Sequence, residues 1–165
     1  MDDGSSKLKQ TKQKFTHEMG QYFDNYGAND IMGRIFALLI FAAKPLSLTE
    51  IAKELQISKA AVSINIRTLK MSGLVEKATV PGDRSDYYRL DSNYGHGVYS
   101  GMMKKVQEGM ELLERTITTL KDIHSPEATG DTELVQYRLT ALKELFESHC
   151  QMITELQKHW SAKKQ

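Results

Sequence analysis

The sequence has few residues that cross-link a chain or interrupt regular structure. Its 165 residues include one cysteine, Cys150, and only three prolines. A single cysteine cannot form an intramolecular disulfide, and it cannot supply the second thiolate of a cysteine-based metal site. We therefore expect a protein of a reducing compartment that is stabilised by its hydrophobic core. The scarcity of proline favours long helices.

The sequence also lacks a membrane span and a secretion signal. The longest apolar run, Ile35 to Ala43, is far shorter than the roughly 20 residues that cross a bilayer. The N-terminus is acidic, whereas a secretion signal begins with basic residues. We expect a cytoplasmic protein that makes no membrane contact.

No group of residues in the sequence is typical of catalysis or of metal binding. Gly95, Gly97 and Gly101 lack the strand, turn and helix that surround a nucleotide-binding loop, and no Ser, His and Asp grouping indicates hydrolysis. The histidines show no ligand spacing with carboxylates: His17, His96, His124, His149 and His159. The sequence predicts no enzyme, no metal and no cofactor.

The charge is nearly balanced overall but unevenly distributed along the chain. A net charge of +1 neither favours nor excludes nucleic acid as a partner. Residues 55–75, however, carry Lys59, Arg67 and Lys70 and no acid, whereas acids outnumber bases in residues 125–160. A local patch that faces phosphate requires such segregation.

The first third of the chain predicts two helices. Apolar residues recur at helical spacing from about Lys7 to Gly27. Asn29 and Asp30 are suited to cap a second helix, Ile31 to Ala43, whose apolar character on every side indicates burial. Pro45 is then expected to stop it.

The next segment predicts a helix, a sharp turn and a second helix. Residues 47–50, Ser-Leu-Thr-Glu, have the spacing of a capping box and begin a short helix that ends near Leu55. Ser58 is expected to cap a helix that starts at Lys59 and ends at Gly73. This arrangement is a helix-turn-helix.

A hairpin is predicted to follow. Residues 74–80 alternate and are rich in strand-forming residues, residues 81–83 are the turn sequence Pro-Gly-Asp, and residues 87–90 form the returning strand. The predicted fold is mainly α with a small β-hairpin, a winged helix-turn-helix domain with long C-terminal dimerisation helices. We expect a supporting N-terminal helix in residues 1–30, the winged domain in residues 31–93 and a helical dimerisation region in residues 94–165.

Two long helices are predicted in the C-terminal region, each with an apolar heptad seam. The seams contain Met103, Val106, Met110, Leu113, Ile117, Leu120 and His124, then Val135, Leu139, Leu142, Phe146, His149, Ile153, Leu156 and Trp160. The two helices can pack on each other as a hairpin. Seams of this length more readily form a homodimer interface.

The second helix of the helix-turn-helix is predicted to read a DNA major groove. Val62, Ile66 and Leu69 cluster on one side of a helical wheel and are expected to face the core. Small and basic residues on the other side allow close approach to base edges, with Arg67 suited to guanine and Lys59 to phosphate. The predicted DNA-binding residues of this helix are Ser58, Lys59, Ala60, Ala61, Ser63, Ile64, Arg67, Thr68 and Lys70.

The hairpin tip is predicted to enter the minor groove through Arg84. Asp83 and Asp86 flank Arg84 and are expected to hold its guanidinium in position. On the strands, Lys77 and Arg89 are expected to contact the DNA backbone.

These motifs resemble the GbsR branch of the MarR regulators over roughly residues 15–90. The resemblance is carried by Met-Gly at 19–20, Met-Gly-Arg-Ile at 32–35, Leu-Thr-Glu-Ile-Ala at 48–52, Ile-Ser-Lys at 57–59 and Pro-Gly-Asp-Arg at 81–84, with Tyr87 and Tyr88. It implies a two-fold dimer, usually a repressor, that binds duplex DNA at a pseudo-palindromic operator. It also implies a small-molecule effector of the choline type.

A quaternary ammonium effector would be held by aromatic faces. The candidate rings are Tyr22, Phe23, Tyr26, Tyr87, Tyr88, Tyr94 and Tyr99, although aromatics at helical spacing also fit a core role. Cys150 lies beside the second seam, where an inert thiol and a redox-sensitive thiol both remain open. The alternative function from a different class is a winged-helix protein-interaction adaptor that binds no DNA.

Overall fold

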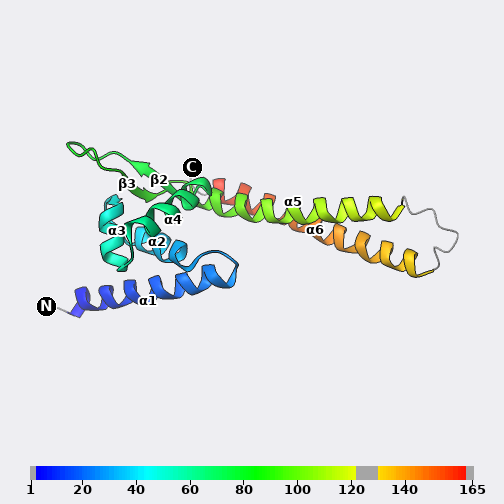
Figure 1. Cartoon of the computed structure of the whole chain (residues 1–165), viewed down its shortest axis with the longest axis horizontal. Coiled ribbons are helices and arrows are strands. Elements are labelled where there is room, and N and C mark those ends of the chain that lie inside the picture. Colours follow the sequence, from blue (N-terminus) through cyan, green and yellow to red (C-terminus); the bar gives the residue numbers. More distant parts are fainter. Residues whose placement is uncertain (1–2, 122–129, 163–165) are drawn as a thin grey trace. The chain divides into compact units, whose positions relative to one another are not determined.

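A computed structural model describes residues 3–121 and 130–162 of the chain. The chain forms two compact units, residues 1–97 and residues 98–165. The elements are α1 (Asp3–Asn25), α2 (Asp30–Ile40), β1 (Leu46–Ser47), α3 (Leu48–Leu55), α4 (Lys59–Met71), β2 (Val75–Ala78), β3 (Tyr87–Leu90), α5 (Tyr94–Lys121) and α6 (Gly130–Ala162) (Figure 1). The predicted fold class, mainly helical with a small β-hairpin, is confirmed.

In the first unit, α1 and α2 cross at two glycines. A Cβ at Gly33 would overlap the carbonyl oxygen of Met19, and a Cβ at Gly20 would lie 2.9 Å from Cγ of Arg34. Asn29 caps α2 as predicted, because its Oδ1 accepts a hydrogen bond from the backbone N–H of Ile31 at 2.8 Å. The absence of a side chain at both positions lets the two helix backbones approach closely.

The second helix is shorter than the sequence predicted. α2 ends at Ile40 rather than Ala43, so the predicted helix end is wrong. Phe41 forms the C-cap, and its ring meets the ring of Phe15 of α1 edge-on at 5.7 Å. The chain then extends to β1, which pairs with β3. Tertiary contacts therefore end the helix before Pro45 is reached.

The helix-turn-helix forms α3 and α4, and its caps are the predicted ones. The Ser47 hydroxyl accepts from the N–H of Glu50 at 3.2 Å, and the Glu50 carboxylate accepts from the N–H of Ser47 at 2.8 Å, which completes the capping box. Ser58 caps α4 by accepting from the N–H of Ala61 at 3.1 Å. Gln56 adopts φ 54° in the turn, and Gly73 adopts φ 66° after α4.

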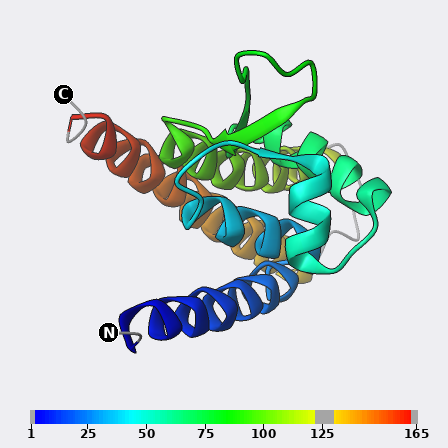
Figure 2. The ribbon, with the colours of Figure 1, turned by 90° about the vertical axis from the view of Figure 1, so that its left-hand side faces the viewer.

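The sheet has three antiparallel strands in the order β1-β3-β2. β2 and β3 form the predicted hairpin, with Val75 opposite Leu90 and Ala78 opposite Tyr87. The hairpin projects from the helices of its unit (Figure 2). The sequence did not predict β1, because two residues are too few for an alternating pattern. The first hairpin strand is also shorter than the predicted residues 74–80.

The core of the first unit lies between α2, α3, α4 and the sheet. It contains Ile35, Phe36, Leu38, Leu39, Ile51, Leu55, Val62, Ile66, Leu69, Leu74 and Val75. Helices α2 and α3 and strand β2 therefore pack against the inner side of α4.

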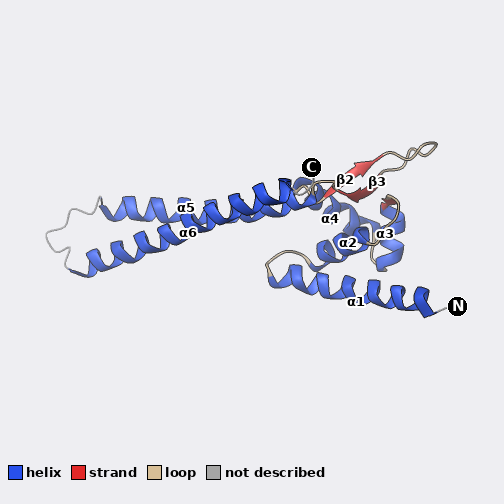
Figure 3. Cartoon of the chain, turned by 180° about the vertical axis from the view of Figure 1, so that it is seen from behind, coloured by secondary structure: helices blue, strands red, loops and turns tan. Residues whose placement is uncertain are grey.

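In the second unit, α5 and α6 run antiparallel and side by side (Figure 3). The ring of Phe146 occupies the space where a Cβ of Gly109 would lie. The ammonium of Lys143 forms an ion pair with Glu114 at 3.0 Å, and Sγ of Cys150 lies 3.6 Å from Sδ of Met110. The hairpin arrangement of the two long helices is therefore present within one chain.

The seam of α5 faces α6, which is the hairpin alternative rather than the favoured use of the seam as a homodimer interface, and only half of the α6 seam packs in the same way. The inward side of α6 has Leu139, Phe146, Ile153 and Trp160, whereas Val135, Leu142, His149 and Leu156 are exposed. Packing against α5 draws in half-buried Lys143 and Cys150 in their place. His124, predicted in the first seam, lies outside the described residues.

Candidate nucleic-acid interface

The outward face of α4 is open along its length. Ser58, Lys59, Ala60, Ile64, Arg67, Thr68 and Lys70 are exposed, and Ala61 and Ser63 are half-buried. The exposed fraction of Ile64 reaches 64%, although it is a large apolar residue. Val62, Ile66 and Leu69 are buried on the opposite side, as predicted. Within the first unit, none of the residues that were predicted to read bases is buried.

Asn65 is a buried polar residue on α4 that sequence reasoning missed. Its side chain is 7% exposed, and its Nδ2 donates to the carbonyl oxygen of Ala61 at 2.8 Å. The bond to the preceding helical turn satisfies the amide, so an asparagine is tolerated on the inner side. Its spacing from Val62 and Leu69 is the sequence signal that places it there.

The basic residues of α4 and the hairpin fall into two groups, those without a carboxylate partner and those with one. Within the described residues, Lys59, Arg67, Lys70 and Arg84 form no ion pair. Their charges remain available to a polyanion.

The basic residues on the strands are matched by carboxylates. Lys77 pairs with Asp86, and Nε of Arg89 lies 2.7 Å from the carboxylate of Glu76. The Asp86 carboxylate raises the pKa of Lys77 above 10.5 by accepting its hydrogen bond and attracting its charge. The expectation that these two bases contact phosphate is not supported, because each is already neutralised.

The wing tip differs from its predicted arrangement. Asp83 accepts hydrogen bonds from the N–H of Ser85 and from the hydroxyl of Tyr87, both at 2.7 Å. These bonds lower the pKa of Asp83 below its ordinary value of 3.8. The prediction that Asp83 and Asp86 hold Arg84 is wrong. Asp83 accepts the hydrogen bond of the Ser85 N–H instead, and Asp86 pairs with Lys77.

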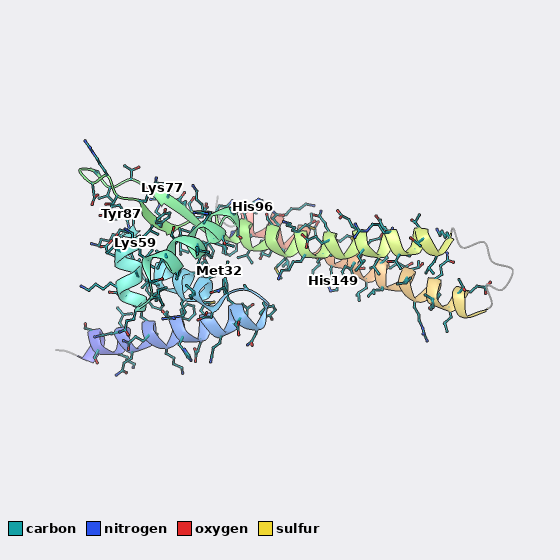
Figure 4. All side chains as sticks on the ribbon, viewed as in Figure 1. Met32, Lys59, Lys77, Tyr87, His96 and His149 are labelled. Atoms are coloured by element: carbon teal, nitrogen blue, oxygen red, sulfur yellow. The ribbon has the colours of Figure 1, made fainter. Side chains whose placement is uncertain are left out.

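A groove of about 540 Å³ joins the wing to the helix-turn-helix. Lys59 of α4 and Arg84 of the wing both line it, together with the first turn of α3 at Ser47, Leu48 and Thr49. Lys59 and Tyr87 lie on the same side of the unit (Figure 4). The α3 residues were missed by sequence reasoning, although the capping box at Ser47 marks a helix N-terminus, which favours anions.

The candidate cage rings do not form one group. Tyr22 lies 4.7 Å from Tyr26 and 6.4 Å from Phe23, measured between ring centroids. The ring of Phe36 lies between two others, with its centroid 5.9 Å from that of Phe23 and 6.2 Å from that of Tyr94. Elsewhere, Tyr87 donates to Asp83, Tyr88 packs on the core from β3, and Tyr99 belongs to the second unit. The structure thus groups the rings of α1 and Tyr94 but not the whole set.

Within residues 3–121 and 130–162, no three His, Cys, Asp or Glu side chains are grouped so that they could hold a metal ion. No helix there has the length and apolar character needed to cross a membrane.

The α3–α4 pair with its hairpin defines a winged helix-turn-helix domain. Residues 34–84, which contain the helix-turn-helix and the start of the wing, match the model of the MarR family. A crystal structure of a transcriptional regulator superposes with a TM-score of 0.75 at 23% identity, over 92% of this chain and 99% of that one. That similarity extends the shared fold to nearly the whole chain.

Two relatives carry regulator names. The HTH-type transcriptional regulator MmpR5 of Mycobacterium tuberculosis is 35% identical over 81 residues, which are 48% of this chain and 49% of that protein. The HTH-type transcriptional regulator YvaV of Bacillus subtilis is 23% identical over 142 residues, which are 83% of this chain and 80% of that protein. The chain thus spans about half the length of the first relative. Both relatives are named as regulators rather than enzymes.

Proposed function

We propose that the protein is a sequence-specific, DNA-binding transcriptional regulator. The observation that carries the proposal is the outward face of α4, which the chain leaves uncovered and on which Lys59, Arg67 and Lys70 have no carboxylate partner within the described residues. In this proposal Arg67 reads guanine in the major groove, Lys59 contacts phosphate and Arg84 enters the minor groove. Its support is that Lys59 and Arg84 line the same groove.

The test is a fluorescence anisotropy titration against duplex DNA from upstream of the protein's own coding region, with a scrambled duplex for comparison. Arg67→Ala should lose about 1–3 kcal/mol of preference for the specific duplex. Arg84→Ala should weaken both duplexes alike and reduce the salt slope by about one. Arg89→Ala is the matched control, since Glu76 already neutralises that arginine.

Binding that neither Arg67→Ala nor Arg84→Ala alters would show that the assigned surface is wrong. A protein that has no salt-dependent affinity for any duplex would instead be a protein-interaction adaptor built on a winged helix.

We further propose that the regulator acts as a homodimer on a pseudo-palindromic operator. An outer apolar stripe follows the second unit and is not used by the hairpin. On α5 it has Val98, Met102 and Leu112, and on α6 it has Val135, Leu142, Leu145, Met152 and Leu156, all at least 41% exposed. A second copy that buries this stripe would complete a four-helix bundle and set the spacing of two recognition helices.

The finer part of the proposal is a GbsR-type repressor that responds to a choline-type effector. Its support is the resemblance of the motifs and the exposed pair Tyr22 and Tyr26, whose ring centroids lie 4.7 Å apart, because aromatic rings bind quaternary ammonium groups. Calorimetric titration with choline tests it: Tyr26→Leu should weaken binding, whereas Tyr137→Leu, at an exposed tyrosine of α6, should not. Equal affinity in both variants would exclude these rings as the effector site.

A further inference from the structure

A second groove of the first unit is unrelated to the outward face of α4. It has a volume of about 610 Å³ and lies between one face of α1, the start of α2 and the end of α3. Charged and polar side chains dominate its lining, and neither Tyr22 nor Tyr26 takes part. The groove is therefore separate from the exposed tyrosine pair.

Arg34 is the central cation of this groove. Its side chain crosses α1 at Gly20, where a Cβ would approach Cγ of Arg34 to 2.9 Å, so glycine at this position makes room for it. One guanidinium nitrogen donates to the carbonyl oxygen of Leu55 at the end of α3, at 2.7 Å. No carboxylate of the described residues pairs with Arg34. Because a guanidinium has five N–H donors, several remain for a ligand.

Thr16 provides a second polar group without a partner. Its side chain is 9% exposed, and its hydroxyl oxygen is buried without a hydrogen-bond partner among the described residues. Leaving such a hydroxyl unsatisfied costs roughly 1–3 kcal/mol in protein interiors. Thr16 lines the same groove as Arg34, but its hydroxyl oxygen is enclosed by the protein and is not reached by a ligand in the groove, so this residue tests stability rather than binding.

The same groove also has carboxylates without partners. Asp24 and Asp30 line it and form no ion pair within the described part of the chain. Glu54, in contrast, is matched by Lys12 at 3.0 Å. Asp30 and Arg34 are one turn apart on α2, a spacing that favours pairing, yet Arg34 is directed to Leu55 instead. Unmatched charges of both signs therefore share one small groove, whose lining also includes Lys9 and His17.

We propose that this groove binds a small zwitterion of the amino-acid type. Its carboxylate accepts hydrogen bonds from the guanidinium of Arg34, and its ammonium faces Asp24 and Asp30. Such a ligand complements both charges, whereas a simple anion would face the two carboxylates and a simple cation would face Arg34. The site takes a different chemical class from a quaternary ammonium alcohol, which has no anionic group.

Isothermal titration calorimetry on the full chain without DNA tests the site. The probes are glycine, β-alanine and γ-aminobutyrate, which separate the two charges by increasing lengths, with acetate and ethylamine as probes of one charge each. At least one zwitterion should bind at least about tenfold more tightly than either single-charge probe. Failure of all three zwitterions, or equal affinity for acetate, would overturn the proposal.

Variants separate ligand contact from structural support. Arg34→Gln should lower the affinity for the best zwitterion by about tenfold or more, because a charge-assisted hydrogen bond is lost. Thr16→Val should leave the affinity unchanged and keep or raise the melting temperature, because it removes an unsatisfied buried hydroxyl that the ligand does not reach. Arg89→Gln, on the hairpin, is the control. Unchanged affinity in Arg34→Gln would refute the site, and since no DNA is present, neither result depends on the function proposed above.

Discussion

At the level of single residues, Ser47 and Glu50 link the fold to the candidate interface. Their reciprocal hydrogen bonds fix the first turn of α3, and that turn forms one wall of the groove shared by Lys59 and Arg84. The carboxylate of Glu50 also accepts a hydrogen bond from the Ser47 hydroxyl at 2.8 Å. A local capping motif therefore determines where a helix N-terminus meets the wing.

Replacing Ser47 by alanine should destabilise the protein through this cap. The backbone N–H of Glu50 loses its acceptor, and the expected cost is about 1 kcal/mol in the free energy of unfolding. Urea unfolding followed by circular dichroism measures it. Ser100→Ala, at an exposed position of α5, should stay within about 0.5 kcal/mol of the parent. Equal stability of both variants would show that the cap is not needed.

The pH dependence of stability should reveal the same contact. Hydrogen bonds from the backbone and hydroxyl of Ser47 lower the pKa of Glu50 below its ordinary value of 4.5. A carboxylate whose pKa is lowered by folding stabilises the folded state at pH values above its ordinary pKa. This contribution is lost as the pH falls through the pKa of the folded state. Glu50→Gln should therefore flatten the decline of the melting temperature in acid. A parallel decline in parent and variant would contradict this assignment.

At the level of elements, the capped helix starts and the ends of α3 and α4 were predictable, whereas the start of α1, at Asp3 rather than near Lys7, and the end of α2 were not. Asn29, Ser47 and Ser58 cap where the sequence placed caps, because capping depends on neighbouring residues only. The end of α2 depends on the contact of Phe41 with Phe15, which no local pattern contains. The wing was placed correctly, but the partners of Asp83 and Asp86 were not, since several nearby donors compete for a carboxylate.

The α1–α2 crossing depends on glycine for a reason that the sequence pattern did not give. Gly33→Ala should lower the free energy of unfolding by about 1–3 kcal/mol, because the new methyl group overlaps the carbonyl oxygen of Met19. Gly101→Ala is the matched control within α5, where nothing lies within 4 Å of the new Cβ. It should stabilise the protein by about 0.5–1 kcal/mol.

In thermal and urea unfolding, Gly33→Ala should lower the free energy of unfolding and Gly101→Ala should raise it, if the α1–α2 crossing is tight. Equal stabilisation by both substitutions would mean that α1 and α2 can move apart without loss of stability. The comparison is sharp because the two substitutions have the same chemistry and the same gain in helix propensity.

At the level of the whole molecule, the outer apolar stripe implies that the single chain is incomplete. α6 has three sides: one packs on α5, one is polar, and the third exposes Leu142, Leu145, Met152 and Leu156. The hairpin alone accounts for only the first. An apolar surface of this regularity indicates a partner helix, which in the proposed homodimer comes from a second copy.

Charges on this stripe should therefore separate the dimer and weaken DNA binding together. Leu145→Glu with Met152→Glu, at positions 52% and 55% exposed, should leave the fold of the single chain intact but place like charges in the proposed interface. Light scattering after size-exclusion chromatography should show a monomer, and affinity for a two-site operator should fall by a factor on the order of a hundred because the gain from simultaneous binding is lost.

Thr140→Glu with Gln151→Glu adds the same charge to the polar side of α6 and should leave the dimer unchanged. A double variant that stays dimeric on the outer stripe would move the interface elsewhere, since two buried glutamates per chain could not be accommodated between apolar helices.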